Sequence, residues 1–413
     1  MNILFVTSSY ATGDFKGGGI TTYSAELVNC YSKNHRISVV ICNLKQDEID
    51  IPGIKTYHIH PYDNSFACAK KLFDIVKEDK PEIIINSNVD LLSLILPYIS
   101  NDIKVISVCH SLGSLETETS GFHHKYADMI VALSESAKEH IEKRFTINPD
   151  KISVIPNFVA ELENAVELIE KKRNSAVPTV VFAGGGTGTK SPDLIAKVLK
   201  GLLKTDLNFN FWWLGGTLPP LNRLSCFKDI RKLIPSDSRV HFTGHIPYTK
   251  AQKLISSANF YLLPSRREGC PISLLEAMRA GAIPVVAEYK ISNREIIQDG
   301  HNGFIINHRD VNRYVKVLSD LIINNKENSY LYDNSYEYFC DNLSYPVWET
   351  KMNALLNVSN MHECRNKTMN ESSFLKDRRK LNCLLRMRRL QTFTRETLPA
   401  YLSMNLQYLI KHY

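Results

Sequence analysis

The chain has 413 residues, a length that predicts two domains of ordinary size rather than one core. Hydrophobic residues make up 44% of it and charged residues 23%, the balance of a globular protein, and no apolar stretch is long enough to span a bilayer. The net charge of +7 belongs to residues 362–413, which contain eleven Lys and Arg against four Asp and Glu. A nucleic-acid enzyme would spread basic residues over its binding face, so we expect no nucleic-acid partner.

The N-terminal sequence MNILFVTSSY has no basic residue before its apolar run. It therefore predicts a first β-strand rather than a signal peptide, and we expect a cytoplasmic protein. The nine cysteines form no close pair and no metal-ligand spacing, which predicts free thiols and neither disulfides nor a zinc site.

Short β-branched runs alternate with helical patterns through the first part of the chain. Strands are expected at residues 3–6, 37–41, 83–85, 105–108, 129–133 and 152–155, and helices at residues 22–33, 66–78 and 134–144. Because such alternation closes right-handed parallel units, it predicts a doubly wound parallel-sheet domain over residues 1–160.

A polar stretch over residues 161–178 is interpreted as a linker, after which the alternation restarts. The second set of strands is expected at residues 179–182, 209–214, 240–242, 260–263, 283–286 and 304–306. The chain would then consist of a second parallel-sheet domain, a helix and a basic helical extension, over residues 179–345, 346–361 and 362–413. The predicted fold class is α/β, with two Rossmann-like domains that face each other across a cleft.

Ligands of open α/β sheets bind beyond the carboxyl ends of the strands, so the loops after the strands are the places to search. Gly17, Gly18 and Gly19 follow the first strand and lead into a helix, where bare backbone could approach a phosphate or a sugar. A flexible turn before a helix would explain these glycines equally well.

A second glycine-rich loop, GGGTGTKS, occupies residues 184–191 after the expected strand at 179–182. Ser191 suits the N-cap of the next helix and Pro192 its first position, so the loop would bring backbone N–H groups and the cation of Lys190 to one point. That is the chemistry of a diphosphate cradle. The loop differs from a P-loop by one residue, because Thr189 stands where G-x-x-x-x-G-K-[ST] requires glycine, so a phosphotransferase remains an alternative.

The third loop, PSRREGCPISLLEAM at residues 264–278, carries two carboxylates eight residues apart. We expect its helix to begin near Ser273, which leaves Glu268 in the loop and places Glu276 in the first turn. Glu276 could bind a ligand, or it could close a capping box with Ser273. Glu268 could also bind a ligand, or it could form a salt bridge with a neighbouring arginine, at position 266 or 267.

These loops resemble those of the retaining glycosyltransferases of family 4, which have the GT-B fold. The segment from Glu268 to Glu276, followed by AMRAGAIPVVA, resembles the E-x7-E signature of that family. Further marks of the family occur in the expected order: Gly18 and Gly19, His110, the sequence VIPN at 154–157, Lys190, and Gly300 with Gly303.

The resemblance implies a nucleotide-diphosphate sugar as donor, a glycan or lipid-linked acceptor, and no cofactor. It implies that Glu268 contacts sugar hydroxyls, Glu276 the ribose and Lys190 the diphosphate, while His110 reaches the donor sugar from the other domain. The catalytic residues would then be His110, Lys190 and Glu268. The implied donor-binding residues are Gly18, Gly19, Gly185, Gly186, Lys190, Glu268, Gly269, Cys270, Ile272 and Glu276.

The sequence also departs from the family pattern. The family usually has an arginine just after the glycine that ends the strand, and here Gly185 or Gly186 stands in that place. The missing charge would have to come from Lys190, from loop N–H groups, or from Arg266 or its neighbour. No cluster of Asp accompanies the loops, so we expect no metal site. A catalytically silent sugar-binding protein is the alternative outside the enzymes.

The basic tail contains FLKDRRKLNCLLRMRRLQTF at residues 374–393, in which leucines alternate irregularly with Lys and Arg. Such a segment could lie on an anionic membrane surface, and we therefore expect peripheral binding to the inner face of the plasma membrane. Helices packed back on the N-terminal domain or on a partner subunit are the alternative.

Overall fold

The structure is a computed structural model of the whole chain. It describes residues 1–11, 18–42, 49–60, 65–87, 89–110, 121, 124–185, 188–216, 230–266, 268–288, 293–357 and 369–378.

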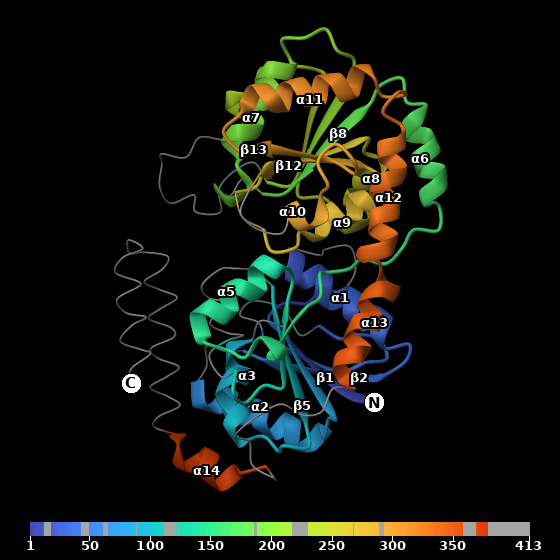
Figure 1. Cartoon of the computed structure of the whole chain (residues 1–413). Coiled ribbons are helices and arrows are strands. Elements are labelled where there is room, and N and C mark those ends of the chain that lie inside the picture. Colours follow the sequence, from blue (N-terminus) through green and yellow to red (C-terminus); the bar gives the residue numbers. More distant parts are fainter. Residues whose placement is uncertain are drawn as a thin grey trace.

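Two domains are stacked one above the other, each with helices on both sides of a parallel sheet (Figure 1). The elements of the N-terminal domain are β1 (Asn2–Thr7), α1 (Gly19–Tyr31), β2 (Arg36–Cys42), β3 (Lys55–Ile59), α2 (Ser65–Asp79), β4 (Ile83–Ser87), α3 (Asp90–Ile95), β5 (Lys104–Cys109), β6 (Met129–Ala132), α5 (Glu135–Phe145) and β7 (Ile152–Val154). Those that follow are α6 (Ala165–Arg173), β8 (Thr179–Ala183), α7 (Pro192–Leu202), β9 (Asn210–Leu214), β10 (Val240–Gly244), α8 (Tyr248–Ser257), β11 (Phe260–Leu263), α9 (Ile272–Met278), β12 (Ile283–Glu288), α10 (Asn293–Ile296), β13 (Phe304–Asn307), α11 (Val311–Ile323), α12 (Tyr330–Asn342), α13 (Tyr345–Leu356) and α14 (Glu371–Lys376).

Within the described residues, the first sheet has seven strands in the order β3-β2-β1-β4-β5-β6-β7, and the second has six in the order β10-β9-β8-β11-β12-β13. All the pairs are parallel, and in both sheets the order reverses at the first strand of the domain. Ligands bind outside such reversal points. The predicted fold class, with two Rossmann-like domains, is confirmed.

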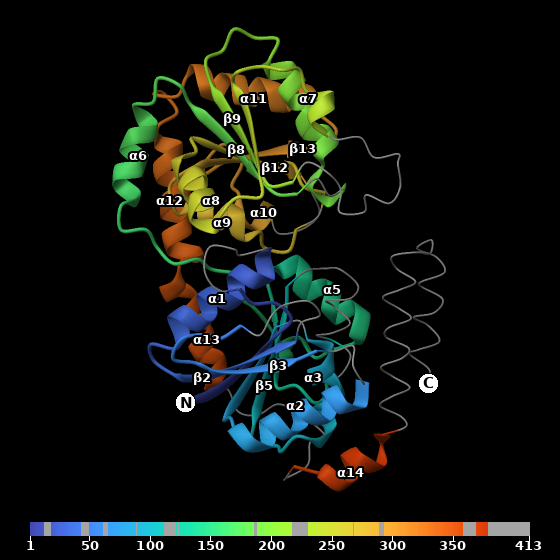
Figure 2. The ribbon, with the colours of Figure 1, turned by 180° about the vertical axis from the view of Figure 1, so that it is seen from behind.

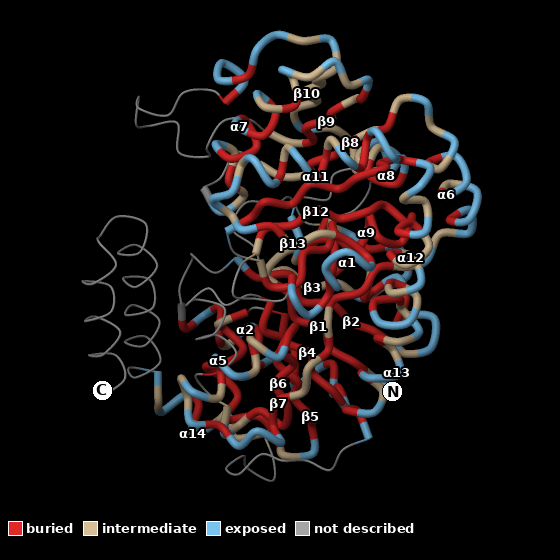
Figure 3. Tube along the Cα trace, turned by 45° about the horizontal axis from the view of Figure 1, so that its top comes forward, coloured by how far each residue is buried: buried red, intermediate tan, exposed pale blue. Residues whose placement is uncertain are grey.

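The central strands of each sheet are buried on both faces, as Figure 3 shows by the red colour along the centre of each domain. Parallel sheets are covered by helices on both sides, which explains why their sequences are continuous apolar runs rather than alternating ones. Strand β3 and helix α6 are among the elements that the sequence did not predict. Strand β3 is an edge strand of half-buried residues, and α6 lies inside the stretch interpreted as a linker.

Helices α12 and α13 run from the second domain back to the first (Figures 1 and 2). The Trp348 ring of α13 lies 4.3 Å from the ring of Phe158, centroid to centroid. The hydroxyl of Tyr31 donates to Asn353 Oδ1 at 2.8 Å, and Lys104 Nζ donates to the carbonyl oxygen of Leu356 at 2.7 Å. Helix α13 is therefore a part of the N-terminal domain in its packing.

Helix α14 also packs on the N-terminal domain, against α2. Phe374 is fully buried, and its ring stacks on those of Phe73 and Phe66 at centroid distances of 4.8 and 5.2 Å. The expectation that Phe374 faces a membrane was wrong, because an aromatic groove of its own chain buries the ring. The packed-back alternative holds for this helix, and residues 379–393 of the basic segment lie outside the described residues.

Six described cysteines, at positions 30, 42, 68, 109, 270 and 340, carry free thiols. In the part of the chain that the structure describes, no helix combines the length and the apolarity needed to cross a membrane.

Candidate functional site

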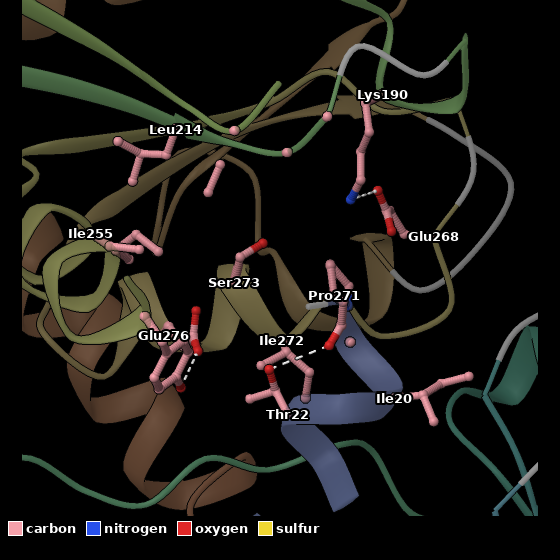
Figure 4. Close-up of a pocket in the computed structure, with 18 of the residues that line it drawn as sticks. Ile20, Thr22, Lys190, Leu214, Ile255, Glu268, Pro271, Ile272, Ser273 and Glu276 are labelled. Carbon is pink, nitrogen blue, oxygen red and sulfur yellow. Dashed lines mark hydrogen bonds and ion pairs between the residues drawn. The ribbon is translucent and has the colours of Figure 1, made fainter. Parts of the chain in front are cut away.

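A cavity of about 690 Å³ lies between the two domains, at the carboxyl ends of both sheets. The N-terminal domain contributes residues that follow β1 and β5, and the C-terminal domain contributes residues that follow β8, β9, β10 and β11. Figure 4 shows side chains from both domains converging on this space. The cavity is thus built where open α/β sheets bind their ligands.

Lys190 and Glu268 face each other at one end of the cavity (Figure 4). Lys190 ends a short 3-10 turn after β8, and Glu268 follows β11. The distance from Nζ to Oε1 is 2.6 Å, and the side chains are 24% and 15% exposed. The ion pair keeps the lysine ammonium inside the cavity, where it is also available to an anionic ligand.

The alternative in which Glu268 pairs with Arg266 was wrong. Arg266 instead approaches Asp193, with 3.5 Å between its NH2 nitrogen and Oδ2, and its backbone N–H donates to the carbonyl oxygen of Thr189. Position 267 lies outside the described residues. The loop after β11 is therefore tied to the glycine-rich loop after β8 by a backbone bond as well as by the ion pair.

Glu276 lies in α9 and is buried. Its Oε1 accepts a hydrogen bond from the Tyr248 hydroxyl at 2.8 Å. Burial raises the pKa of the Glu276 carboxyl, while Arg279 and the bond from Tyr248 act in the opposite direction. The carboxylate therefore borders the cavity in a poorly solvated position, where it can accept hydrogen bonds from ligand hydroxyls.

The capping box proposed for Ser273 and Glu276 was wrong. The N-cap position of α9 is occupied by Pro271, and no side chain caps the helix. Ser273 is consequently the second helical residue, so it lacks the N-cap geometry that the reciprocal bond requires. Of the two uses considered for Glu276, ligand binding is the one that its position permits.

Tyr248 opens α8 after β10, and it was not selected from the sequence. It lines the cavity together with Gln252, from the same helix. Gln252 Oε1 accepts a bond from Arg279, whose other guanidinium nitrogen donates to the carbonyl oxygen of Ala160 at 2.9 Å. The position of Tyr248 after a strand end was a usable signal in the sequence. An uncharged side chain in a helix, however, carries little functional information by itself.

His110 follows β5 and enters the cavity from the N-terminal domain. Its Nε2 shares a hydrogen bond with Ser87 Oγ at 2.8 Å, and its ring lies edge-on to Tyr23 at 4.7 Å. Burial lowers the pKa of His110 to about 4. The imidazole is therefore neutral near pH 7 and can act there as a hydrogen-bonding group but not as a standing cation.

Glycines of both domains border the cavity. Gly18 has φ of 92° at the N-cap of α1, a conformation that other residues rarely adopt. A Cβ on Gly19 would lie 3.9 Å from the side chain of Ile272, across the domain interface. Gly185 lines the cavity with open space beside it, whereas Gly186 lies outside the described residues.

Ser191 occupies the N-cap position of α7 as expected, but its side chain does not cap the helix. Its backbone is left-handed, with φ of 54°, and its hydroxyl bonds with His308 Nε2 at 2.8 Å. The prediction of a capping Ser191 was wrong, because the hydroxyl bonds with His308, the residue after β13, instead of an N–H group of α7.

Gly269, Cys270 and Ile272 all line the cavity. Asn157 Nδ2 donates to the carbonyl oxygen of Cys270 at 2.7 Å, which fastens this loop to the junction between the domains. Burial raises the pKa of the Cys270 thiol to about 12, so the thiol stays protonated. Within the described residues, no group of three His, Cys, Asp or Glu is placed to hold a metal ion.

Two family models match the chain, one over each domain. The model described as Glycosyltransferase Family 4 matches residues 17–161, and the model described as Glycosyl transferases group 1 matches residues 166–338.

Two similar proteins are named as a glycosyltransferase and a galactosyltransferase. An uncharacterised glycosyltransferase of Haemophilus influenzae is 28% identical over 275 residues, which are 63% of this chain and 72% of that protein. The UDP-Gal:alpha-D-GlcNAc-diphosphoundecaprenol alpha-1,3-galactosyltransferase of Escherichia coli is 25% identical over 280 residues, 61% of this chain and 70% of that protein. The crystal structure of Anabaena HepE with UDP-glucose has a TM-score of 0.65 at 13% identity and covers 87% of this chain and 100% of that one, so the two share a fold.

Proposed function

Because the chain belongs to the family 4 glycosyltransferases of the GT-B fold, we propose that it transfers a sugar from a nucleotide-diphosphate sugar to a hydroxyl acceptor. The proposed reaction retains the anomeric configuration and needs neither a metal nor a cofactor. The observation that carries the proposal is the cavity between the domains, in which Lys190, Glu268 and Glu276 converge from the loops after β8 and β11.

In the proposed mechanism, the bond between the anomeric carbon and the diphosphate oxygen breaks while the acceptor oxygen bonds to the same face of the sugar. Negative charge develops on the diphosphate, where Lys190 would stabilise it, and positive charge develops on the sugar ring. The departing phosphate oxygen would take the acceptor proton. Glu268 would orient the ring through its hydroxyls, and neutral His110 would bind the sugar from the other domain.

The proposed donor-binding set also includes Glu276, which would accept bonds from the ribose, and the residues of the glycine and Cys270 loops that line the cavity. UDP-sugars are the first donors to test, because the E. coli relative is named for UDP-Gal and the Anabaena structure contains UDP-glucose. The diphosphoundecaprenol substrate of the E. coli relative makes a lipid-linked glycan the first acceptor to test. Such a reaction would serve lipopolysaccharide, capsule or other polysaccharide synthesis at the inner face of the membrane.

The experiment that tests the function measures donor turnover with UDP-glucose, UDP-galactose and UDP-N-acetylglucosamine. We expect Lys190→Ala and Glu268→Ala each to lower turnover by about 100-fold or more, because electrostatic groups at the reacting centre carry effects of that size. Both variants should keep the melting temperature close to that of the parent chain, since both side chains border a cavity rather than the core. Lys200→Ala, an exposed lysine of α7 in the same domain, is the matched control.

Donor binding without turnover of any sugar would favour the catalytically silent sugar-binding protein. Loss of folding in step with the loss of activity would show that the pair is structural and would remove it from the proposed mechanism.

A further inference from the structure

Glu295 makes a contact between the domains that the proposed chemistry does not use. It belongs to α10 of the C-terminal domain, and its carboxylate lies at the N-terminus of α5 in the N-terminal domain. Oε2 accepts from the backbone N–H of Glu135 at 2.7 Å, while Oε1 accepts from the backbone N–H and the hydroxyl of Ser136, at 3.1 and 2.7 Å.

This contact completes the cap of α5. The first N–H groups of a helix lack partners within the helix, and they carry the positive end of its dipole. Ser134 at the N-cap accepts from the N–H of Ala137, and Glu295 accepts from the two N–H groups before it. One helix thus receives part of its cap from its own chain segment and the rest from the other domain. The Glu135 side chain adds a second carboxylate at this helix end, but Glu295 binds the backbone of Glu135.

Helix α10 is held firmly to its own domain. The Tyr338 hydroxyl of α12 donates to the carbonyl oxygen of Glu295 at 2.7 Å, and the buried Asn293 donates to the carbonyl oxygen of Ala287 at 3.1 Å. Because α10 cannot follow α5, any separation of the domains at this point would break all three bonds from Glu295.

The contact lies away from the places where the chain crosses between the domains. The two segments that cross between the domains meet at Val159 and Ser344, which form an isolated β-bridge beside the start of α13. Figures 1 and 2 both show α5 and α10 on the opposite side of the interface from the junction of α12 and α13. Bonds at this distance from the crossings resist opening of the cavity more effectively than bonds beside them.

We propose that Glu295 is a positioning residue that holds the domains in the closed arrangement in which His110 faces the loops of Lys190 and Glu268. Without Glu295, part of the free energy of ligand binding would be used to close the domains. The apparent affinity for the ligand would therefore be lower. The effect on binding rests on the proposed function, but the effect on domain arrangement does not.

The test uses Glu295→Ala and Glu135→Pro in the full chain. The proline removes the N–H that binds Oε2, and it stands at the first position of α5, which proline favours, so the helix itself is retained. Small-angle scattering of the protein without ligand should give a larger radius of gyration for both variants, and more so for Glu295→Ala, which loses all three bonds. Addition of saturating UDP should restore the compact form.

In the same variants, calorimetry with UDP should show affinity that is about 5- to 10-fold weaker for Glu295→Ala, the size expected from loss of a capping carboxylate. The donor KM should rise by a similar factor, with kcat within about 2-fold of the parent value because saturating donor recloses the domains. The double variant should have the same radius of gyration and the same UDP affinity as Glu295→Ala alone. The matched control is Glu139→Gln, an exposed carboxylate of α5 whose partner among the described residues is Lys143 of the same helix, at 3.2 Å.

An unchanged radius of gyration in Glu295→Ala would overturn the proposal, whether or not the chain binds UDP. So would a lower melting temperature with unchanged UDP affinity and KM, which would make the carboxylate a cap of local structure only. A larger radius in a protein that binds no UDP would leave the positioning role intact and would contradict the proposed donor instead.

Discussion

At the cavity wall, an oxygen of the Glu276 carboxylate accepts a hydrogen bond from the Tyr248 hydroxyl. In Tyr248→Phe that oxygen would lose its donor, which disfavours the charged form and raises the pKa of a carboxyl that burial already raises. We expect UDP binding to weaken by about 5- to 10-fold, the usual effect of one hydrogen bond to a charged group. The loss should grow as the pH falls, because a higher pKa populates the neutral carboxyl at a higher pH.

Calorimetric titration with UDP between pH 5 and 8 measures this effect. Tyr330→Phe, at an exposed tyrosine 52% accessible to solvent, is the control and should bind as the parent chain does. Equal UDP affinity in Tyr248→Phe and the control at every pH would show that Tyr248 does not act through Glu276.

The residues that motifs and strand ends select were predictable, but their partners were not. Lys190 and Glu268 were selected because each follows a strand that the apolar pattern reveals, whereas His110 was selected through the resemblance to the family. The bonds from Tyr248 to Glu276 and from Glu295 to α5 join segments 28 and about 160 residues apart, which no local pattern encodes. The same limit explains the wrong caps, because a capping pattern in sequence competes with tertiary partners that only the fold supplies.

Helix α6 shows how a segment interpreted as a linker can have a packing role. Lys172, near its end, is 3% exposed and donates to the carbonyl oxygen of Ala280, just after the helix that carries Glu276. Its sequence, AVELIEKKR, is too short and too polar to stand out as a core helix, so the sequence alone did not predict it. Strand β3 was missed for a similar reason, since edge strands are short and half-exposed.

Burial lowers the pKa of Lys172 to about 7, whereas in the unfolded chain the amine would titrate near 10.5. Between these values the unfolded chain binds one proton more than the folded chain, so the free energy of unfolding increases with pH, by up to about 1.4 kcal/mol per unit. We expect Lys172→Met to remove this contribution, which would flatten the curve of stability against pH between 7 and 10.

Urea unfolding at several pH values measures the change. Its control is Lys171→Met, at a neighbouring lysine that is exposed and pairs with Glu167 at 2.6 Å, and this variant should keep the slope of the parent chain. A slope in Lys172→Met as steep as that of the control would mean that the buried amine is protonated throughout this range.

The C-terminal part of the chain connects the two domains and then returns to the first. Helix α14 is fixed there by the Phe374 ring, by Tyr98, whose hydroxyl donates to Asp377 at 2.6 Å, and by the ion pair of Lys77 with Glu371 at 2.7 Å. The sequence predicted a basic extension but could not show that its first turn is core, because a lone phenylalanine among charges looks like one side of an amphipathic helix. The proposed membrane contact is therefore limited to residues 379–393, which contain five Lys and Arg and no acidic residue.

Two truncations separate the two roles of this extension. A chain that ends after Asn360 loses Phe374 and exposes the rings of Phe66 and Phe73, so its unfolding free energy should fall by about 3 kcal/mol or more.

A chain that ends after Arg378 keeps α14, and it should keep its stability and its turnover of a soluble acceptor. It should nevertheless lose binding to phosphatidylglycerol vesicles, to which each basic residue contributes up to about 1 kcal/mol at low ionic strength. Vesicle sedimentation at low and high salt measures this binding. Equal sedimentation of the full chain and the chain ending after Arg378 would exclude residues 379–393 as the membrane contact, because both chains contain everything that precedes them.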